Sequence, residues 1–324
     1  MLSEKDNFMR ALAGEVPEYV PRYNSMLSPP PAIFSGSRVN GVGRDVFGVE
    51  WSSEGSAVAA AMPKMDKFIL EDIRDWGDVI KFPDFSGIDW ESMAKKDLAN
   101  FDPSFARSGG TVIQGFFQCL MSFMGFTNGL IAIHEEPEEV KALLNYLCDG
   151  YLSYADAYLK AYKPDFITFG DDIAHERAPF VSLETFRDVF APVWRRYISF
   201  FKERGYLAMH HNCGKFDLFV DDIVDMGFNA WEPAQPANDL MAIKKKYGNK
   251  FMITGSFETR PFVPHLNVTE EQCRAAVRDV IDRLAVGGGY CFITIGYLDQ
   301  TPVFVQRMQW INDEFEKYRM TFYQ

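Results

Sequence analysis

The chain has 324 residues, of which 47% are hydrophobic and 24% charged, and this composition is ordinary for a soluble globular enzyme. The net charge of −12 argues against a nucleic-acid partner and against an anionic membrane surface. The N-terminal residues lack the basic and apolar regions of a signal peptide, and no apolar stretch is long enough to span a membrane. The five cysteines show no paired spacing. We therefore expect a cytoplasmic protein with no membrane attachment.

The N-terminal part predicts an irregular start to the fold. Residues 4–13 resemble a short helix that Gly14 ends, and residues 19–23 could form a first strand. Residues 28–55 are rich in proline and glycine, which predicts an excursion of loops and short strands. Within it, the alternation over residues 46–51 suggests a hairpin.

From about residue 111 the pattern becomes strand then helix. Strands are predicted at residues 111–114, 165–169, 206–210, 228–231, 251–254 and 290–294. Between them, Pro137 stands at a first helical position, and Thr269 and Gln272 have the spacing of a capping box. The glycines at 287–289 precede a strand, which indicates a tight turn and not a dinucleotide fingerprint. The alternation predicts a (β/α)8 TIM barrel with an elaborated N-terminal region, formed as a single domain by residues 1–324.

Polar residues are concentrated just after successive predicted strands, at residues 170–172, 210–213, 231–232, 255–258 and 296–297. In a barrel these positions line the C-terminal face, where active sites lie. His211 and Cys213 end one strand and could both ligate zinc. A hydrogen-bonded histidine and a buried cysteine would give the same pattern, Asp171 and Asp172 could cap a helical turn, and Glu232 could be a solvated loop residue. Cys119, Cys148 and Cys273 are interpreted as packing residues, and His175 has no assigned role.

Several segments resemble the uroporphyrinogen decarboxylase superfamily, and more closely its corrinoid-dependent methyltransferase branch, which includes O-demethylase components. They are His-Asn-Cys-Gly-Lys at 211–215, Gly-Phe-Asn-Ala-Trp at 227–231, Gln-Pro-Ala-Asn-Asp-Leu at 235–240, and residues 10–17, 45–51, 170–172 and 180–182. The resemblance implies a (β/α)8 barrel that holds zinc at its C-terminal face and transfers methyl groups to or from a separate corrinoid protein. The decarboxylase proper has an Arg-Gln-Ala-Gly-Arg segment where residues 20–24 contain one arginine, which argues against porphyrinogen decarboxylation.

The chain departs from this family at one ligand position. Thiol-methylating relatives place a second cysteine after the last strand, where this sequence has Gly296. Cys291 lies five residues earlier, about 15 Å away along a strand. We predict Glu232 as the third zinc ligand because the similar zinc barrels of cobalamin-independent methionine synthases use a glutamate after the next strand. Glu258, Cys291 and an aspartate of the 171–172 pair remain open alternatives.

The expected zinc ligands favour one type of methyl transfer over the others. One thiolate, one imidazole and one carboxylate leave zinc more Lewis-acidic than several thiolates do, which suits polarisation of an ether oxygen. We therefore predict O-demethylation, in which a methyl group moves from a methoxylated, aromatic small molecule to the cobalt of a corrinoid protein. Asp171, Asp172 and Tyr297 are predicted to orient the donor or supply a proton, and Trp231, Phe257 and Asn212 to contact it.

The sequence leaves three other points open. The reaction could instead carry methyl from a methyl-corrinoid to a thiol or to tetrahydrofolate. The barrel could also bind a corrinoid or tetrapyrrole without catalysis. The chain could form a homodimer.

Overall fold

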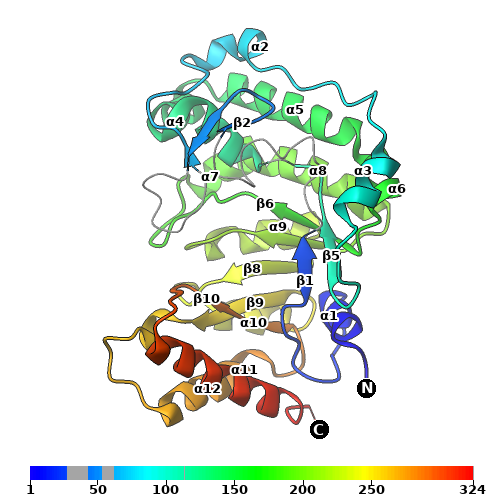
Figure 1. Cartoon of the computed structure of the whole chain (residues 1–324). Helices are drawn as coiled ribbons and strands as arrows, with labels where there is room; N and C mark the ends of the chain where they lie inside the picture. Colours follow the sequence, from blue (N-terminus) through cyan, green and yellow to red (C-terminus); the bar gives the residue numbers. More distant parts are fainter. Residues whose placement is uncertain (28–42, 53–61, 113, 324) are drawn as a thin grey trace.

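The computed structural model describes residues 1–27, 43–52, 62–112 and 114–323, and it is built around one parallel sheet of seven strands (Figure 1). The order is β1-β5-β6-β7-β8-β9-β10, and every neighbouring pair is parallel. The strands are β1 (Ser25–Leu27), β5 (Ala106–Gly109), β6 (Phe166–Gly170), β7 (Ala208–His211), β8 (Ala230–Ala234), β9 (Met252–Glu258) and β10 (Tyr290–Ile295).

The chain just before β1 closes this sheet. Arg22 forms a parallel bridge with Phe292 of β10. The Tyr23 N–H donates to the Phe292 carbonyl and the Phe292 N–H donates to the Pro21 carbonyl, each at 2.9 Å. The predicted TIM-barrel-like α/β fold is confirmed, with seven strands in the described part of the sheet where a regular barrel has eight.

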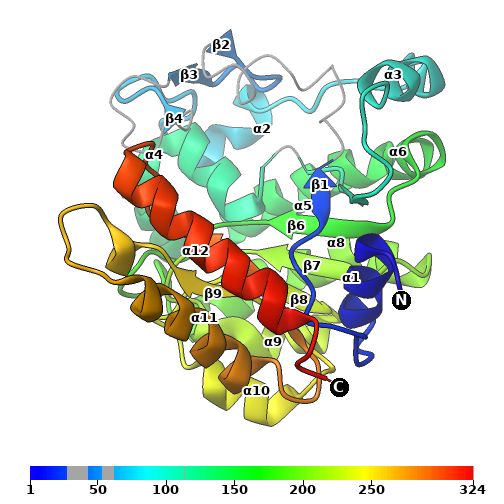
Figure 2. The same cartoon turned by 60° about the horizontal axis from the view of Figure 1, so that its bottom comes forward.

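Helices surround this sheet, as Figures 1 and 2 show. They are α1 (Glu4–Leu12), α2 (Trp76–Val79), α3 (Trp90–Asp97), α4 (Phe116–Glu135), α5 (Pro137–Ser153), α6 (Ala155–Tyr162), α7 (Leu183–Thr185), α8 (Ala191–Glu203), α9 (Val220–Met226), α10 (Leu240–Tyr247), α11 (Glu270–Leu284) and α12 (Pro302–Arg319). A π-helical turn at Phe186–Phe190 joins α7 to α8. Pro137 opens α5, and the capping box of Thr269 and Gln272 opens α11, so both predicted helix starts are confirmed.

A small antiparallel sheet in and just after the N-terminal excursion consists of β2 (Gly43–Arg44), β3 (Glu50–Ser52) and β4 (Met62–Pro63). β2 and β3 form the hairpin predicted around residues 46–51, with Gly43 opposite Trp51. The rest of the predicted excursion, residues 28–42 and 53–55, lies outside the described residues.

Two predicted strands are displaced. The first strand lies at Ser25–Leu27 and not at residues 19–23, because the Val20 N–H bonds the Arg319 carbonyl of α12 and only residues near 22 reach β10. The strand predicted at residues 111–114 is wrong: Thr111, Val112 and Gln114 lie outside helices and strands. The strand there is β5, Ala106–Gly109, which contains no β-branched or aromatic residue and so has little β-propensity.

The barrel interior is filled at one end by apolar side chains. Phe8, Ala11 and Leu12 of α1 pack against residues near the starts of the strands, so that α1 covers the N-terminal end. These strand residues are Ala106, Phe166, Met209, Ala230, Met252 and Cys291. Because side chains alternate along a strand, Met209 and His211 face the interior while His210 faces the helices. The C-terminal end of the interior is therefore the place for polar groups.

One helix of the described residues, α4, is long and apolar enough to cross a membrane by length and composition, so the expectation that no apolar stretch reaches this length was wrong. Within its most apolar 18-residue window, 67% of the residues are buried. Such burial is what the core helix of a soluble protein shows.

Candidate metal centre

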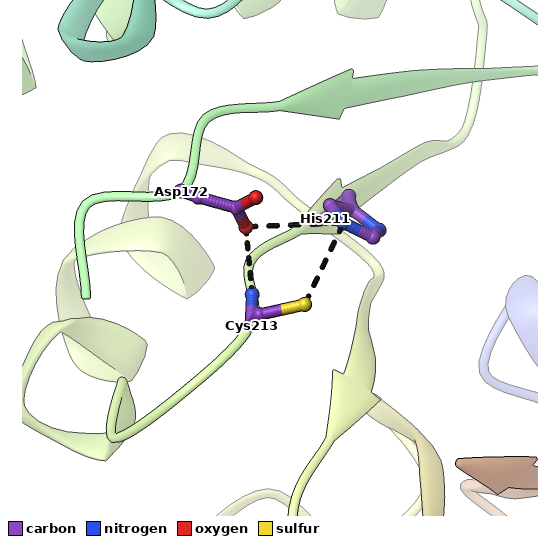
Figure 3. A group of neighbouring side chains, drawn as sticks. All are labelled: Asp172, His211 and Cys213. Atoms are coloured by element: carbon purple, nitrogen blue, oxygen red, sulfur yellow. Dashed lines mark hydrogen bonds and ion pairs between the residues drawn. The ribbon is translucent and has the colours of Figure 1, made fainter. Parts of the chain in front are cut away.

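Three side chains with metal-ligand chemistry meet at the C-terminal end of the barrel (Figure 3). Asp172 follows β6, His211 ends β7, and Cys213 lies two residues further on. One donor atom from each lies within 4.8 Å of the others. His211 Nε2 is 3.8 Å from Asp172 Oδ1 and 4.0 Å from Cys213 Sγ. The structure thus places the side chains of His211 and Cys213 close together, and Asp172 of the 171–172 pair lies beside them.

The turn after β7 brings Cys213 back toward His211 through Gly214. Gly214 has a φ of 87° and packs on the backbone of the loop after β6, where a Cβ would lie 2.5 Å from the His175 carbonyl oxygen. The same carbonyl accepts the Lys215 N–H at 2.8 Å. His175, left without a role by the sequence, thus supports this turn through its backbone.

Residues of the loop after β8 cradle the same turn. Gln235 Oε1 accepts the Gly214 N–H at 2.5 Å. Asn238 Oδ1 accepts the Phe216 and Asp217 N–H groups, and its Nδ2 donates to the Gly214 carbonyl at 2.9 Å. The Gln-Pro-Ala-Asn segment therefore shapes the turn that carries Cys213, a role that its sequence alone does not reveal.

Both carboxylate oxygens of Asp172 are held. Oδ1 accepts the Cys213 N–H at 2.8 Å, and Oδ2 accepts the side-chain amide Nε2 of Gln118 at 3.2 Å. Gln118 lies in the first turn of α4 and is not among the polar residues placed just after the predicted strands. No signal in the sequence singles it out.

Glu232 contacts the far side of the His211 ring. Its Oε1 lies 2.7 Å from His211 Nδ1, and only 11% of the Glu232 side chain is exposed. An ionised carboxylate can only accept, so Nδ1 is the donor and Nε2 is the nitrogen directed at Asp172 and Cys213. Burial alone would lower the pKa of His211, but Glu232, Cys213 and Asp172 raise it well above its usual value. These groups together favour a positive charge at Nε2.

The donor set fits zinc. Thiolate, imidazole and carboxylate are the ligands that zinc uses in proteins, and three protein ligands with an open position are typical of catalytic sites. The side chains of His211 and Asp172 are 37% and 32% exposed, so the cluster is accessible. A carboxylate on the other nitrogen of a ligating histidine is a frequent supporting contact. This geometry favours Asp172 over Glu232 as the third ligand.

Asp171, predicted to act on the substrate, anchors a helix instead. It is fully buried and accepts the backbone N–H groups of Phe117 and Gln118 at 2.9 and 3.0 Å and the Trp194 indole N–H at 3.1 Å. Burial raises its pKa to about 7, although these hydrogen bonds act in the opposite direction. Asp171 therefore supplies the cap that Gly115, the N-cap residue of α4, cannot provide.

The three predicted substrate contacts lie in packed positions. Trp231 is fully buried against the helices, because its neighbours on β8 face the interior, and its indole donates to the Asn212 carbonyl at 2.9 Å. Phe257 stacks on Phe262 with ring centroids 5.5 Å apart and is 2% exposed. Asn212 is buried, and its Oδ1 accepts the Ile173 N–H at 2.9 Å, which ties together the loops after β6 and β7. Trp231 and Asn212 therefore take part in the hydrogen bonding of the loops beside the cluster, and Phe257 takes part in aromatic packing on β9.

The remaining candidates lie apart from the cluster. Cys291 is fully buried among the apolar residues at the other end of the barrel interior. Glu258 ends β9 and pairs with Arg260 at 2.8 Å. Tyr297 follows β10 at the same end of the barrel as the cluster, is 38% exposed, and packs edge-on against Phe304. Among the described residues, the cluster contains one thiol.

Comparisons with known proteins agree with this architecture. Residues 111–295, more than half of the chain, match the family model for uroporphyrinogen decarboxylase (URO-D). No curated protein matches. Among solved structures, a methyltransferase from Methanosarcina mazei superimposes with a TM-score of 0.65 over 98% of this chain and 99% of that one, at 15% sequence identity. That identity shows a shared fold, and the family match shows that the chain belongs to the uroporphyrinogen decarboxylase (URO-D) family.

Proposed function

We propose that this protein is a zinc-dependent methyltransferase that moves a methyl group from a methoxylated aromatic compound to the cobalt of a corrinoid protein. The observation that carries this proposal is the cluster of Asp172, His211 and Cys213 at the C-terminal end of the barrel. The likeness of fold to a methyltransferase from Methanosarcina mazei supports the reaction class.

The donor set supports ether cleavage over thiol activation. The cluster offers one thiolate together with an imidazole and a carboxylate, and Cys291 is too deep in the barrel to add a second. Zinc held by Asp172, His211 and Cys213 would supply Lewis acidity to the ether oxygen, which is otherwise a poor leaving group.

Neighbouring groups orient the proposed zinc ligands. Glu232 accepts the Nδ1–H of His211 and so leaves the Nε2 lone pair for the metal. Asp172 is held at both oxygens, and Cys213 is held by the Gly214 turn. Tyr297 is the proposed proton donor to the released oxygen, since Asp171 is enclosed in the core.

The proposed reaction balances without a further reactant. The O–CH3 bond breaks, and the oxygen keeps its bonding pair and takes up one proton to give a phenol. Cobalt(I) of the corrinoid donates the electron pair of the new Co–CH3 bond and becomes methyl-cobalt(III).

The proposal extends to partners and location. A corrinoid protein would approach the open C-terminal end of the barrel, and the methyl donor would bind between it and the cluster. We propose that residues 1–324 form a single barrel domain that acts in the cytoplasm. We propose further that the protein binds neither a membrane nor nucleic acid, and that it forms a homodimer. The net charge of −12 supports the exclusion of nucleic acid.

The experiment combines purified protein, a reduced corrinoid protein and a panel of methoxylated arenes, with methyl-cobalt followed by its absorbance. The expected result is methyl-cobalt formation with at least one arene, one zinc per chain, and loss of both in Cys213→Ala. Cys273→Ala, a change at a buried cysteine of α11, is the matched control and should retain both. Demethylation of methyl-cobalt by a thiol or tetrahydrofolate, with no arene activity, would replace this proposal by the reverse transfer. Tight corrinoid or tetrapyrrole binding without zinc or turnover would indicate a binding protein.

A further inference from the structure

Gln118 contacts the metal centre from an element outside the strand ends. It lies in the first turn of α4, and its Nε2 donates to Asp172 Oδ2 at 3.2 Å. The other oxygen of Asp172, Oδ1, accepts the Cys213 N–H and is the one that lies 3.8 Å from His211 Nε2. Each oxygen of this carboxylate therefore has a separate partner, and Gln118 holds the one directed away from the cluster.

The position of Gln118 is fixed independently of that contact. Asp171 accepts the backbone N–H groups of Phe117 and Gln118, which locks the start of α4 onto the loop after β6. At Gly115 a Cβ would lie 2.2 Å from Asp171 Cγ, so the helix approaches as closely as the backbone allows. The backbone of Gln118 is thus bound by one aspartate while its side chain binds the next.

A neutral side-chain amide, such as that of Gln118, is well suited to hold the Asp172 carboxylate. A neutral donor restrains the Asp172 carboxylate without cancelling the negative charge that a metal ion needs, whereas lysine or arginine would compete with the cation. A restrained carboxylate also loses less rotational freedom when it becomes a ligand.

We propose that Gln118 is a positioning residue of the metal centre, which holds Asp172 so that Oδ1 faces His211 and Cys213 and thereby sets the affinity for zinc. This inference depends on the metal centre of the proposed function. It adds a residue that neither the strand-end pattern nor the resemblance identifies.

The test measures the zinc dissociation constant by chelator competition in the parent and in Gln118→Leu, a change that removes the donor at similar volume. Zinc binding is expected to weaken by about 10- to 100-fold, the usual effect of removing a supporting contact. In the cobalt(II)-substituted protein, the visible bands are expected to shift as Asp172 reorients. Asn128→Leu, at an exposed position of the same helix, is the matched control and should change neither.

A double-mutant cycle with Asp172→Asn distinguishes positioning from a general effect on α4. If Gln118 acts through Asp172, Gln118→Leu has little further effect on zinc affinity in the Asp172→Asn background. Equal losses in both backgrounds, or an unchanged affinity and cobalt spectrum in Gln118→Leu, would overturn the inference while the metal centre stands. A parent protein that binds no zinc would instead refute the metal centre itself.

Discussion

Replacement of Glu232 by glutamine tests how the metal centre is supported. The change keeps the shape of the side chain but removes the charge that lies 2.7 Å from His211 Nδ1, at a position where only 11% of the side chain is exposed. Hydrogen bonds to charged groups contribute about 1.5–3 kcal/mol. If most of this supports the ligating form of His211, zinc should bind about 10- to 100-fold more weakly, since about 1.4 kcal/mol corresponds to a factor of ten.

The assay is chelator competition at neutral pH, together with X-ray absorption of the zinc-loaded protein. Glu258→Gln is the matched control, because Glu258 also ends a strand but pairs with Arg260. We expect the control to bind zinc as the parent does, and Glu232→Gln to keep the same number of zinc ligands. Loss of one oxygen ligand in Glu232→Gln would show that Glu232 binds the metal directly. A loss of affinity confined to Glu258→Gln would refute the reasoning altogether.

Three further predictions concern single residues. Cys213→Ala should lose zinc, whereas Cys291→Ala should keep it, because Cys291 is enclosed among apolar side chains. The zinc content of the two purified variants measures this. Loss of zinc in both variants would place Cys291 at the metal. Gly214→Ala should lower the free energy of unfolding by more than Gly205→Ala does, because both glycines have a positive φ but only Gly214 faces a backbone carbonyl. For Gly205→Ala we expect a loss of about 1 kcal/mol. Equal losses of the two variants in urea unfolding would contradict this steric account. Burial lowers the pKa of Lys244 from 10.5 to about 8. Between these values the unfolded chain binds more protons than the folded chain, so the stability due to this group rises with pH. Lys244→Met should reduce that rise in unfolding measured from pH 7.5 to 10.5, and an unchanged slope would argue against this account.

The strand-to-helix alternation was sufficient to predict the barrel because β6, β9 and β10 combine aromatic residues with isoleucine and threonine, and apolar-faced helices separate the later strands. Prediction failed at β5, whose Ala-Arg-Ser-Gly sequence carries no strand pattern. Ala106 packs in the interior, whereas Gly109 faces Tyr158 of α6 and Pro164. Prediction also failed at the first strand, β1, which pairs with β5 while the residues just before it contact β10 and α12, and all of these contacts are remote in sequence. Such pairings depend on closure of the barrel, which local propensity does not encode.

For the candidate site, too, the sequence could predict some features and not others. His211 and Cys213 could be identified because both ligands lie on one strand end, two residues apart. The roles of Asp171 and Asp172 could not be separated from the sequence, since one residue of offset turns one side chain into the core and the other toward the cluster. Gln118 could not be found at all, because its contact joins residues 54 positions apart.

The hydrogen bonds that tie the loop after β6 to the turn after β7 have a consequence for how the protein would acquire the proposed zinc. Asp172 accepts from the Cys213 backbone, Asn212 accepts from Ile173, and the His175 carbonyl accepts from Lys215, so the donors are brought together by the protein itself. A small zinc-finger domain needs its metal in order to fold. Here the protein's own hydrogen bonds hold the donors, so we expect the chain to fold as a stable barrel without metal, to load zinc as a late step, and to survive chelation in a form that can be recharged.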